Sequence, residues 1–316
     1  MAPPLIATLT LNPSLDELFI VRRLRTDDLN RAERMERYPG GKGLNVSRVV
    51  RELGGRTMAY GVAGGRDGQW LLDALRRLRV PHRFTPIDGT TRNNVKIVVR
   101  QPRGELQINA PGPCVTAAEL ARLLRALNTA RPQPQWLVCA GSLPPGVPMA
   151  VYRRVIVAVR RRGIACALDA DGGALRAGLA ARPDFIKPNR QEARRLLGRP
   201  VRTVGDAARA ARRWVDNGVR WVVLSLGPSG AVLATRDTRE TWLARPPAVR
   251  VDSTIGAGDS LVAGFLVTLG RGGSAVDALR QGVACGAACA MTPGTELCHR
   301  ADVDRLAPRV RLQRVL

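Results

Sequence analysis

Short apolar runs alternate along most of the chain with stretches in which apolar residues recur every three or four positions. Runs such as Ile6 to Leu11, Trp136 to Ala140 and Trp221 to Leu226 are typical of strands buried on both faces. The periodic stretches between them are typical of helices with one buried face. Strands that alternate with helices predict the α/β class, a doubly wound and mostly parallel sheet flanked by helices, as one domain over 1–316.

Two other stretches, about 17–38 and 91–110, alternate apolar and polar residues one by one. This period of two is typical of strands with one face in water. Strands are expected at Leu18 to Val21, at Asn30 to Met35, and in a hairpin from Thr91 to Asn109. Together they are expected to form a small second β-sheet that caps a cleft at the edge of the main sheet.

Loops with polar residues or glycines follow several of the strand-like runs. Ligands of parallel sheets bind outside the carboxyl ends of the strands, so these loops are expected to meet at one edge. The turn from Asn12 to Asp16 carries a carboxylate after the first run, although an Asx-type turn without a ligand explains it equally well. The residues expected to gather at this edge are Asp16, Ser142, Lys187, Gly227 and Asp259.

The stretch from Val251 to Gly264 has the composition of an anion-binding turn with a carboxylate inside it. Gly256 and Gly258 can bring backbone N–H groups close to an oxyanion, and the helical pattern that follows places them at a helix N-terminus. A bound phosphate would repel Asp259 unless this residue served the chemistry, for example as a general base that accepts a proton from an attacking hydroxyl. The alternative is a glycine-rich turn whose aspartate complements the helix dipole.

A second glycine turn, Pro39 to Gly43, leads into a helical pattern from Leu44 to Leu53. Its Lys42 is one of only three lysines, with Lys96 and Lys187, in a chain whose other 47 basic residues are arginines. A position that keeps lysine in such a chain is expected to need a compact ammonium group rather than a planar guanidinium.

The formal net charge of +24 would ordinarily indicate a nucleic-acid partner. Nearly all of this charge comes from arginine, as a compositional bias would produce, aromatic residues are only 4%, and the sequence has no nucleic-acid-binding motif. A basic nucleic-acid-binding protein therefore stays as an alternative of a different class. The sequence has no apolar run that could span a bilayer and no signal-like N-terminus, so we expect a soluble cytoplasmic protein. The six scattered cysteines are expected to be reduced core residues rather than metal ligands.

Several segments match motifs of a known family. The segment from Gly40 to Val46, Gly-Gly-Lys-Gly-Leu-Asn-Val, resembles the N-terminal signature of the ribokinase-like sugar kinases of the pfkB type, and Asp252 to Asp259 resembles their C-terminal signature. Lys187-Pro188-Asn189 with Glu192 is similar to their Asn-x-x-Glu motif for metal and phosphate. The segments that look most like the phosphosugar branch of this family are Asn12 to Asp16, Thr91 to Asn94, Gly141 to Gly146 and Ser225 to Gly230.

The resemblance implies a ribokinase-like fold in which the small sheet is a lid that closes over the site and often pairs two subunits into a dimer. It implies an ATP- and Mg²⁺-dependent kinase in which Asp259 is the base, Asp16 and Asn45 hold sugar hydroxyls, and Arg92 and Lys42 meet the sugar's own phosphate. The full set implied is Asp259, Gly256, Ala257 and Gly258 for catalysis; Asp16, Gly41, Lys42, Asn45, Arg92, Asn94 and Ser142 for the sugar; Lys187, Asn189, Ser225, Gly227 and Gly230 for ATP; and Asn189 with Glu192 for magnesium, through water.

The phosphosugar branch contains the minor 6-phosphofructokinase, 1-phosphofructokinase and tagatose-6-phosphate kinase. The spacing around Gly294 to Cys298 resembles the first of these and implies conversion of fructose 6-phosphate to fructose 1,6-bisphosphate. Two features resemble the other two kinases instead. The segment from Asp27 to Arg31 has no lysine where the minor phosphofructokinases place a substrate-binding one, and Lys42 is closer to the 1-phosphofructokinase and tagatose patterns.

Overall fold

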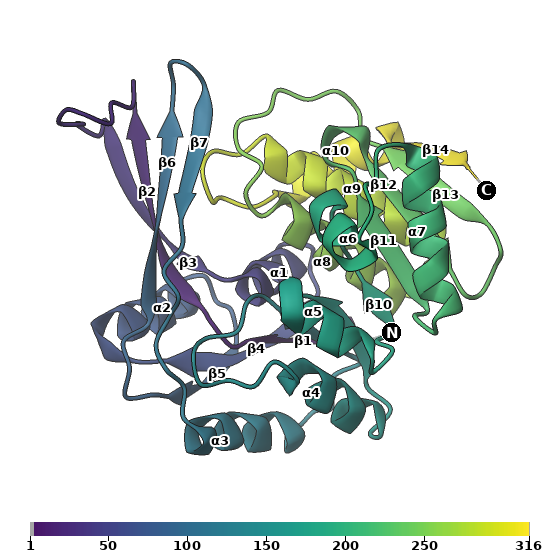
Figure 1. Ribbon diagram of the computed structural model, residues 1–316, viewed down its shortest axis with the longest axis horizontal. Coiled ribbons are helices and arrows are strands. Elements are labelled where there is room, and N and C mark those ends of the chain that lie inside the picture. The colour runs from purple at the N-terminus through teal and green to yellow at the C-terminus, as the bar shows by residue number, and fades with distance from the viewer. Residues whose placement is uncertain (1–2, 316) are drawn as a thin grey trace.

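The structure is a computed structural model that describes residues 3–315. Its centre is a ten-stranded sheet with the order β14-β13-β12-β11-β10-β9-β8-β1-β4-β5 (Figure 1). The strands from β11 to β5 in this order pair in parallel, and β12, β13 and β14 are added to one edge by antiparallel pairing. The bounds are β1 Leu5–Thr10, β4 Arg56–Ala63, β5 His82–Pro86, β8 Trp136–Ala140, β9 Ala165–Asp169, β10 Phe185–Ile186, β11 Trp221–Ser225, β12 Ala231–Thr235, β13 Thr241–Arg245 and β14 Arg311–Arg314.

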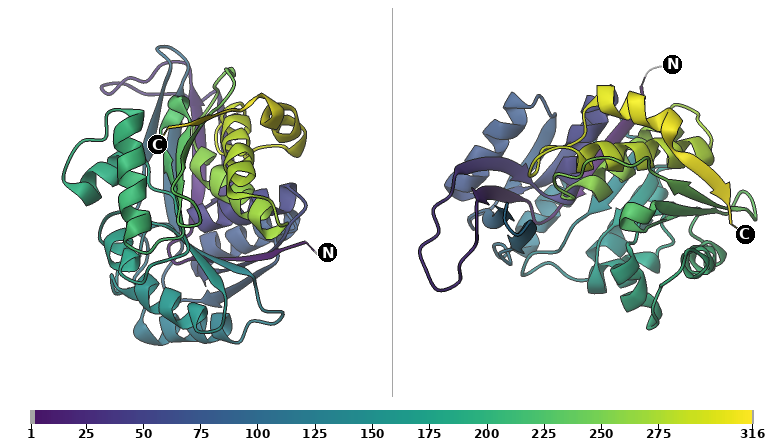
Figure 2. Two further views of the ribbon diagram at one scale, coloured as in Figure 1. Left: turned by 90° about the vertical axis from the view of Figure 1, so that its right-hand side faces the viewer. Right: turned by 90° about the horizontal axis from the view of Figure 1, so that it is seen from above.

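Helices cover both faces of this sheet (Figure 2). One core packs α1, α8, α9 and α10 against one face, with α2 beside α1 on β4, and the other core packs α3 to α7 against the opposite face. Successive strand residues pack alternately into the two cores. Ile6, for example, packs into the first core and Ala7 into the second. The helices are α1 Lys42–Glu52, α2 Gly65–Arg77, α3 Ala117–Asn128, α4 Val151–Arg160, α5 Gly172–Leu179, α6 Arg190–Leu197, α7 Val204–Asp216, α8 Ala257–Gly270, α9 Ala275–Ala290 and α10 Arg300–Leu306, with short 3₁₀ turns η1 Gly227–Ser229 and η2 Ala307–Arg309. The predicted doubly wound α/β fold is confirmed.

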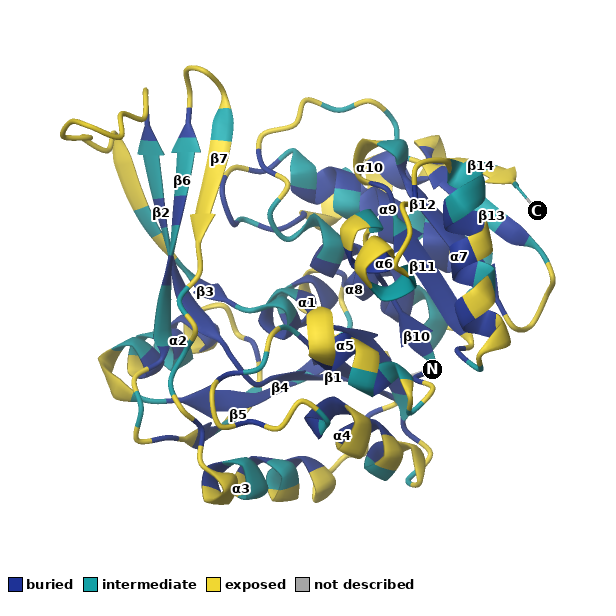
Figure 3. Cartoon of the chain, in the orientation of Figure 1, coloured by how far each residue is buried: buried dark blue, intermediate teal, exposed yellow. Residues whose placement is uncertain are grey.

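A small four-stranded sheet stands beside the main body, with the order β3-β2-β6-β7 (Figure 1). Its strands are β2 Ser14–Val21, β3 Arg34–Gly40, β6 Arg92–Val99 and β7 Gly104–Ile108. The strands β2 and β6 pair in parallel, and the two outer strands pair with them in antiparallel fashion. Figure 3 shows that β7, at one edge, is exposed over most of its length. The second sheet that the alternating pattern predicted therefore exists.

Two boundaries of this sheet differ from the sequence prediction. Asp16 was expected in a turn after the first strand, but it lies in β2, which begins at Ser14. The strand expected at Asn30 to Met35 instead runs over Arg34–Gly40. The reason is long-range pairing, because Ser14 faces Gly40 and Asp16 faces Asn94 across the sheet, and local turn propensity contains no information about such partners.

Within residues 3–315 the structure has no helix that is both long and apolar enough to cross a bilayer. Five of the six cysteines are buried and free, as expected, whereas Cys114 is exposed.

Candidate active site

Asp259 lies in the first turn of α8, directly after the glycine turn. Gly256 precedes the helix with a φ of 80°, a left-handed conformation that glycine adopts without strain. Asp259 is only 7% exposed, and its Oδ2 accepts a hydrogen bond of 2.8 Å from Asn45 Nδ2 in α1. Asn45 and Asp259 are 214 residues apart in the sequence, and their hydrogen bond brings the two glycine turns together at one carboxylate.

The environment of Asp259 makes it a better base than an ordinary aspartate. Burial, followed by the negative charge of Asp169, raises the pKa of Asp259 to about 6. Lys42, the hydrogen bond from Asn45, and Lys187 act in the opposite direction, because each stabilises the charged form. A carboxyl group with this pKa is ionised at neutral pH and can accept a proton from a hydroxyl group in a transition state.

Two of the three lysines flank one buried aspartate, Asp169, at the end of β9. Lys42 Nζ lies 3.1 Å from Asp169 Oδ1, and Lys187 Nζ lies 3.6 Å from Asp169 Oδ2. Burial by itself raises the pKa of Asp169, but the two ammonium groups outweigh it and the pKa is lowered. Burial likewise lowers the pKa of Lys42, but the carboxylates of Asp169, Glu192 and Asp259 outweigh it and the pKa is raised. Asp169 and Lys42 are therefore charged at neutral pH.

Lys42 lies between two carboxylates. The resemblance placed Lys42 with Arg92 at the phosphate of the sugar, whereas its ammonium group lies between Asp169 and Glu192, 3.7 Å from Glu192 Oε1. Gly41, directly before it, has a φ of 126° and precedes the first turn of α1. Lys42 therefore lies beside Glu192, a residue expected at the magnesium ion, and its expected role at the sugar phosphate stays a prediction.

Sequence reasoning missed Asp169. The sequence has a short apolar run from Ala165 to Leu168 followed by two aspartates, Asp169 and Asp171, and nothing local distinguishes one from the other. The distinguishing contacts come from Lys42, 127 positions before Asp169, and from Lys187 on the next strand connection. The usable signal was its place at the carboxyl end of a buried parallel strand, where ligand-binding residues gather.

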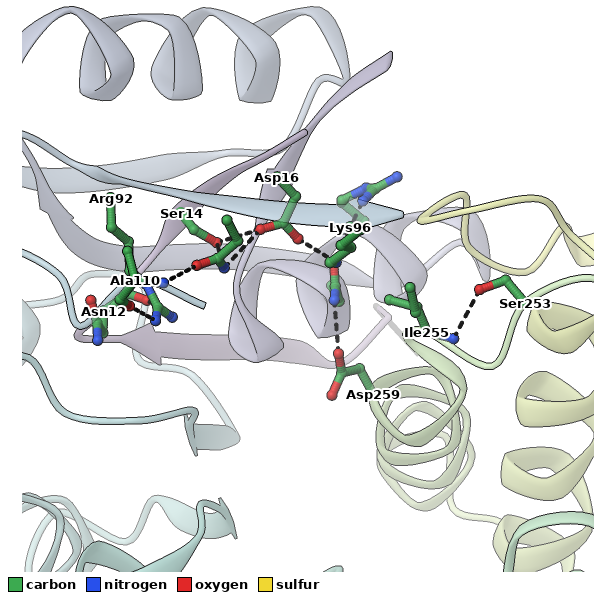
Figure 4. A network of polar contacts seen from close by, with 12 residues as sticks. Asn12, Ser14, Asp16, Arg92, Lys96, Ala110, Ser253, Ile255 and Asp259 are labelled. Carbon is green, nitrogen blue, oxygen red and sulfur yellow. Dashed lines mark hydrogen bonds and ion pairs between the residues drawn. The ribbon is translucent and has the colours of Figure 1, made fainter. Parts of the chain in front are cut away.

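A second polar cluster lies on the small sheet (Figure 4). Lys96 Nζ lies 2.6 Å from Asp16 Oδ2, and both side chains are nearly buried. The other oxygen of Asp16 accepts from Ser14 Oγ at 2.7 Å and from Asn94 Nδ2 at 3.0 Å. Figure 4 shows this cluster opposite Asp259 on α8. Asn94 thus orients Asp16, and Lys96, which the sequence analysis noted only as a retained lysine, neutralises it.

Arg92 lies at the start of β6 and holds the neighbouring loops. Its two terminal nitrogens donate to Ala110 O at 2.7 Å and to Asn12 O at 2.9 Å. Its Nε is buried and has no hydrogen-bond partner among residues 3–315, and the same is true of Asn12 Oδ1. Asn12 Nδ2 lies 3.3 Å from Ser142 Oγ. Arg92, Asn12 and Ser142 are therefore brought together, and the Arg92 Nε donor is left over for an oxygen of a ligand.

On the nucleotide side, Asn189 and Glu192 form a capping box at the start of α6. Asn189 Oδ1 accepts from Glu192 N, and Glu192 Oε2 accepts from Asn189 N, each at 2.9 Å. Asn189 also pairs with Ser225 in a short parallel bridge. Gly227 has a φ of 61° beside open space, whereas a Cβ at Gly230 would lie 1.9 Å from Ala244 O. The glycine at 230 is therefore explained by strand packing.

The residues present fit a magnesium ion that is held partly by phosphate and water. Asp169 Oδ2 is buried without a hydrogen-bond donor among the described residues, and Glu192 Oε1 is left outside the capping box. Across residues 3–315 no three His, Cys, Asp or Glu side chains form a metal site by themselves. Magnesium commonly keeps several waters and uses one or two carboxylates together with substrate phosphates, which matches this arrangement.

Comparison with known proteins gives the class. Residues 9–302 match the family model of the "pfkB family carbohydrate kinase", and the chain belongs to this family. It is 37% identical over 303 residues to the ATP-dependent 6-phosphofructokinase isozyme 2 of Mycobacterium tuberculosis, covering 96% of this chain and 88% of that protein. It is 31% identical over 311 residues to the 1-phosphofructokinase of Bacillus subtilis, covering 98% and 100%.

Solved structures agree with this family. The phosphofructokinase-2 of Escherichia coli, in complex with substrates and products, is similar with a TM-score of 0.91 and 33% identity, covering 96% of this chain and 98% of that one. Ribokinase from Thermotoga maritima, at 19% identity, has a TM-score of 0.75 and covers 96% and 98%. The ribokinase-like fold that the sequence motifs implied is confirmed.

Proposed function

We propose that this chain is an ATP- and Mg²⁺-dependent kinase that converts fructose 6-phosphate to fructose 1,6-bisphosphate. The observation that carries the proposal is Asp259, a buried carboxylate with a raised pKa in the first turn of α8, whose charged form Lys42 and Lys187 stabilise. Relatives in Mycobacterium tuberculosis and Escherichia coli that are named 6-phosphofructokinase support the choice of sugar. The relative named 1-phosphofructokinase keeps that activity, with tagatose-6-phosphate kinase, as the alternative.

In the proposed reaction Asp259 accepts the proton of the attacking sugar hydroxyl. The hydroxyl oxygen forms the new bond to the terminal phosphorus of ATP, the bond to the bridging oxygen breaks, and its electron pair leaves with ADP. The N–H groups of Gly256, Ala257 and Gly258 at the helix start stabilise the charge of the transferring group. Loss of such a base typically lowers the rate by about 10²–10⁴-fold.

Lys42 and Lys187 supply positive charge on the ATP side, where Asp169 holds both ammonium groups in place. A bound magnesium ion would neutralise part of the phosphate charge during transfer. Asp169 and Glu192 are the carboxylates that would hold it, through water in the case of Glu192. Asn189 would act mainly by fixing Glu192 through the capping box.

On the sugar side, Asp16 would accept hydrogen bonds from two sugar hydroxyls while Asn94 and Lys96 fix its orientation. The free Nε donor of Arg92, with Ser142 nearby, would meet the sugar's existing phosphate. The small sheet would close as a lid and exclude water that could otherwise hydrolyse ATP.

The test is Mg²⁺-dependent release of ADP from ATP with fructose 6-phosphate, fructose 1-phosphate, tagatose 6-phosphate and unphosphorylated fructose. We expect turnover with fructose 6-phosphate and its loss in Asp259→Asn. Turnover with another phosphoketohexose alone would move the assignment to the alternative. Equal turnover by Asp259→Asn would remove Asp259 as the base, and turnover of unphosphorylated sugar alone would remove the role of Arg92.

We also propose a homodimer that pairs through the small sheet. The outer strand β7 exposes Leu106 and Ile108, at 43% and 57%, and β3 exposes Met35 at 45%. Exposed apolar residues on the edge strands of a sheet favour pairing with a second chain. Light scattering is expected to give twice the chain mass for the native protein and a smaller mass for Ile108→Glu; a monomeric native protein would refute the dimer. The charged substrates proposed here do not cross membranes, which supports a cytoplasmic location.

A further inference from the structure

A cavity lies at the edge of the main sheet opposite the catalytic residues. It has a volume of about 280 Å³ and is lined by the first residues of β1 and β4, the last turn of α1, and the loop before β8. Its walls include Ala7, Thr57 and Tyr60, which are buried, and the exposed Arg51, Arg56 and Arg131. The cavity therefore reaches from the surface down to the sheet.

Three arginines and no acidic residue line this cavity. Arg51, Arg56 and Arg131 have no acidic partner within ion-pair distance among residues 3–315, and none of the lining residues is acidic. By contrast, Arg76, Arg209, Arg280 and Arg305 each pair with an aspartate three residues away on their helix. Three unpaired guanidinium groups around one hollow raise the local potential and favour an anion.

The remainder of the lining is apolar. Leu5, Met58, Pro81, Pro132 and Pro134 provide carbon surface, and Tyr60, which also lines the cavity, is buried. A site of this composition fits a ligand with a small carbon skeleton and two or more negative charges better than a bare inorganic ion. We propose that this cavity is a second anion-binding site, separate from the catalytic one, for a small phosphorylated or polycarboxylate metabolite.

The two sites are separate but share an element. The helix α1 carries Lys42 and Asn45 of the catalytic site in its first turn and Arg51 of the cavity in its last turn. Its 11 residues span about 16 Å. A ligand at the cavity thus binds one end of a helix whose other end holds Asp259 through Asn45.

The test uses citrate, 3-phosphoglycerate and inorganic phosphate as probes in physiological salt, measured by titration calorimetry. The test variant is Arg51→Gln/Arg56→Gln/Arg131→Gln. The matched control is Arg153→Gln/Arg154→Gln/Arg161→Gln, which removes the same charge from exposed positions near α4. We expect citrate or 3-phosphoglycerate to bind the native protein and the control equally, at least about 10-fold tighter than phosphate, and to bind the test variant at least about 10-fold more weakly.

A second readout locates the ligand directly. Met58 lines the cavity and is one of five methionines, so a methyl-labelled methionine spectrum is expected to show one ligand-induced shift, at Met58. The single variant Arg56→Gln, with a smaller loss of affinity, serves if the triple variant does not fold. Equal affinity in all forms, or no shift of the Met58 signal at saturation, would overturn the proposal. Neither readout depends on turnover, so the outcome is independent of the proposed kinase activity.

Discussion

Lys42 and Asp169 form an ion pair of 3.1 Å between residues that lie 127 positions apart, one in the first turn of α1 and one at the end of β9. Asp169 also lies 3.6 Å from Lys187. The two lysines and the aspartate act on Asp259 in opposite directions, because Asp169 raises the pKa of Asp259 and the lysines lower it. The pKa of about 6 is thus a balance that single substitutions can move either way.

The pH dependence of kcat/KM should report this balance. We expect activity to rise with pH through an apparent pKa near 6, the value of Asp259. Lys42→Met should raise this apparent pKa, and Asp169→Asn should lower it. Both variants should also have a lower maximal kcat/KM. Profiles of residual activity from pH 4.5 to 9 measure both shifts. Shifts of the same sign in the two variants would contradict the electrostatic account.

Asp259→Asn should make the protein more stable at neutral pH while it loses activity. The folded-state pKa of Asp259 is raised above its unfolded value of 3.8 to about 6, so the folded state binds the proton more tightly. Protonation of Asp259 therefore stabilises the folded state, and this contribution is complete below pH 3.8 and is lost as pH rises through 6. Above that pH the ionised carboxylate lowers the free energy of unfolding by at most about 3 kcal/mol relative to the protonated group. Urea unfolding at pH 5 and pH 8 should show a larger gain for Asp259→Asn at pH 8. An equal gain at both values would assign the effect to packing.

Lysine at 187 should not be replaceable by arginine, although the chain uses arginine at 47 other positions. Lys187 is only 5% exposed, and its Nζ lies 3.2 Å from where a Cβ on Gly258 would be. The wider guanidinium group would displace the turn before Asp259, so Lys187→Arg should lower kcat/KM by about 10- to 100-fold. The matched exchange on the surface, Arg209→Lys, should leave the kinetics unchanged. Native kinetics for Lys187→Arg would show that only charge matters here.

Gly256→Ala should cost more stability than Gly272→Ala. Both glycines have positive φ values, 80° and 85°, so both substitutions carry the same backbone strain of about 1 kcal/mol. A Cβ at Gly256 would also lie 2.5 Å from Leu297 Cδ2, whereas nothing lies within 4 Å at Gly272. We therefore expect an additional loss of about 1–3 kcal/mol for Gly256→Ala in urea unfolding. Equal losses would mean that Leu297 moves aside freely.

The fold and half of the site could be predicted from the sequence because their signals are local. The alternation of strands and helices predicts the α/β class. The two glycine turns predict the start of the helices that carry Lys42, Asn45 and Asp259. Asp169 and Lys96 could not be assigned, since the significance of Asp169 depends on Lys42, 127 residues away, and that of Lys96 on Asp16, 80 residues away. For the same reason Asp16 was placed in a turn, because its strand is defined by Asn94 on β6.

The electrostatic surroundings of Lys42 also could not be predicted from local sequence patterns. Lys42 is expected from its motif to meet the sugar, and its observed neighbours come from elsewhere in the chain, Asp169 from the end of β9 and Glu192 from the first turn of α6. The parallel sheet brings these segments together at one edge. The sequence predicts this edge, but it does not predict which side chains contact each other there.

The three lysines have one more consequence. Lys42, Lys96 and Lys187 are all of the lysines in the chain, and all three pair with carboxylates of the candidate site. Protein grown on lysine enriched in ¹³C at the ε carbon would therefore give three side-chain resonances, each from a different corner of the site and without background from the surface. The chain's bias toward arginine thus leaves the active site selectively observable by magnetic resonance in the unmodified protein.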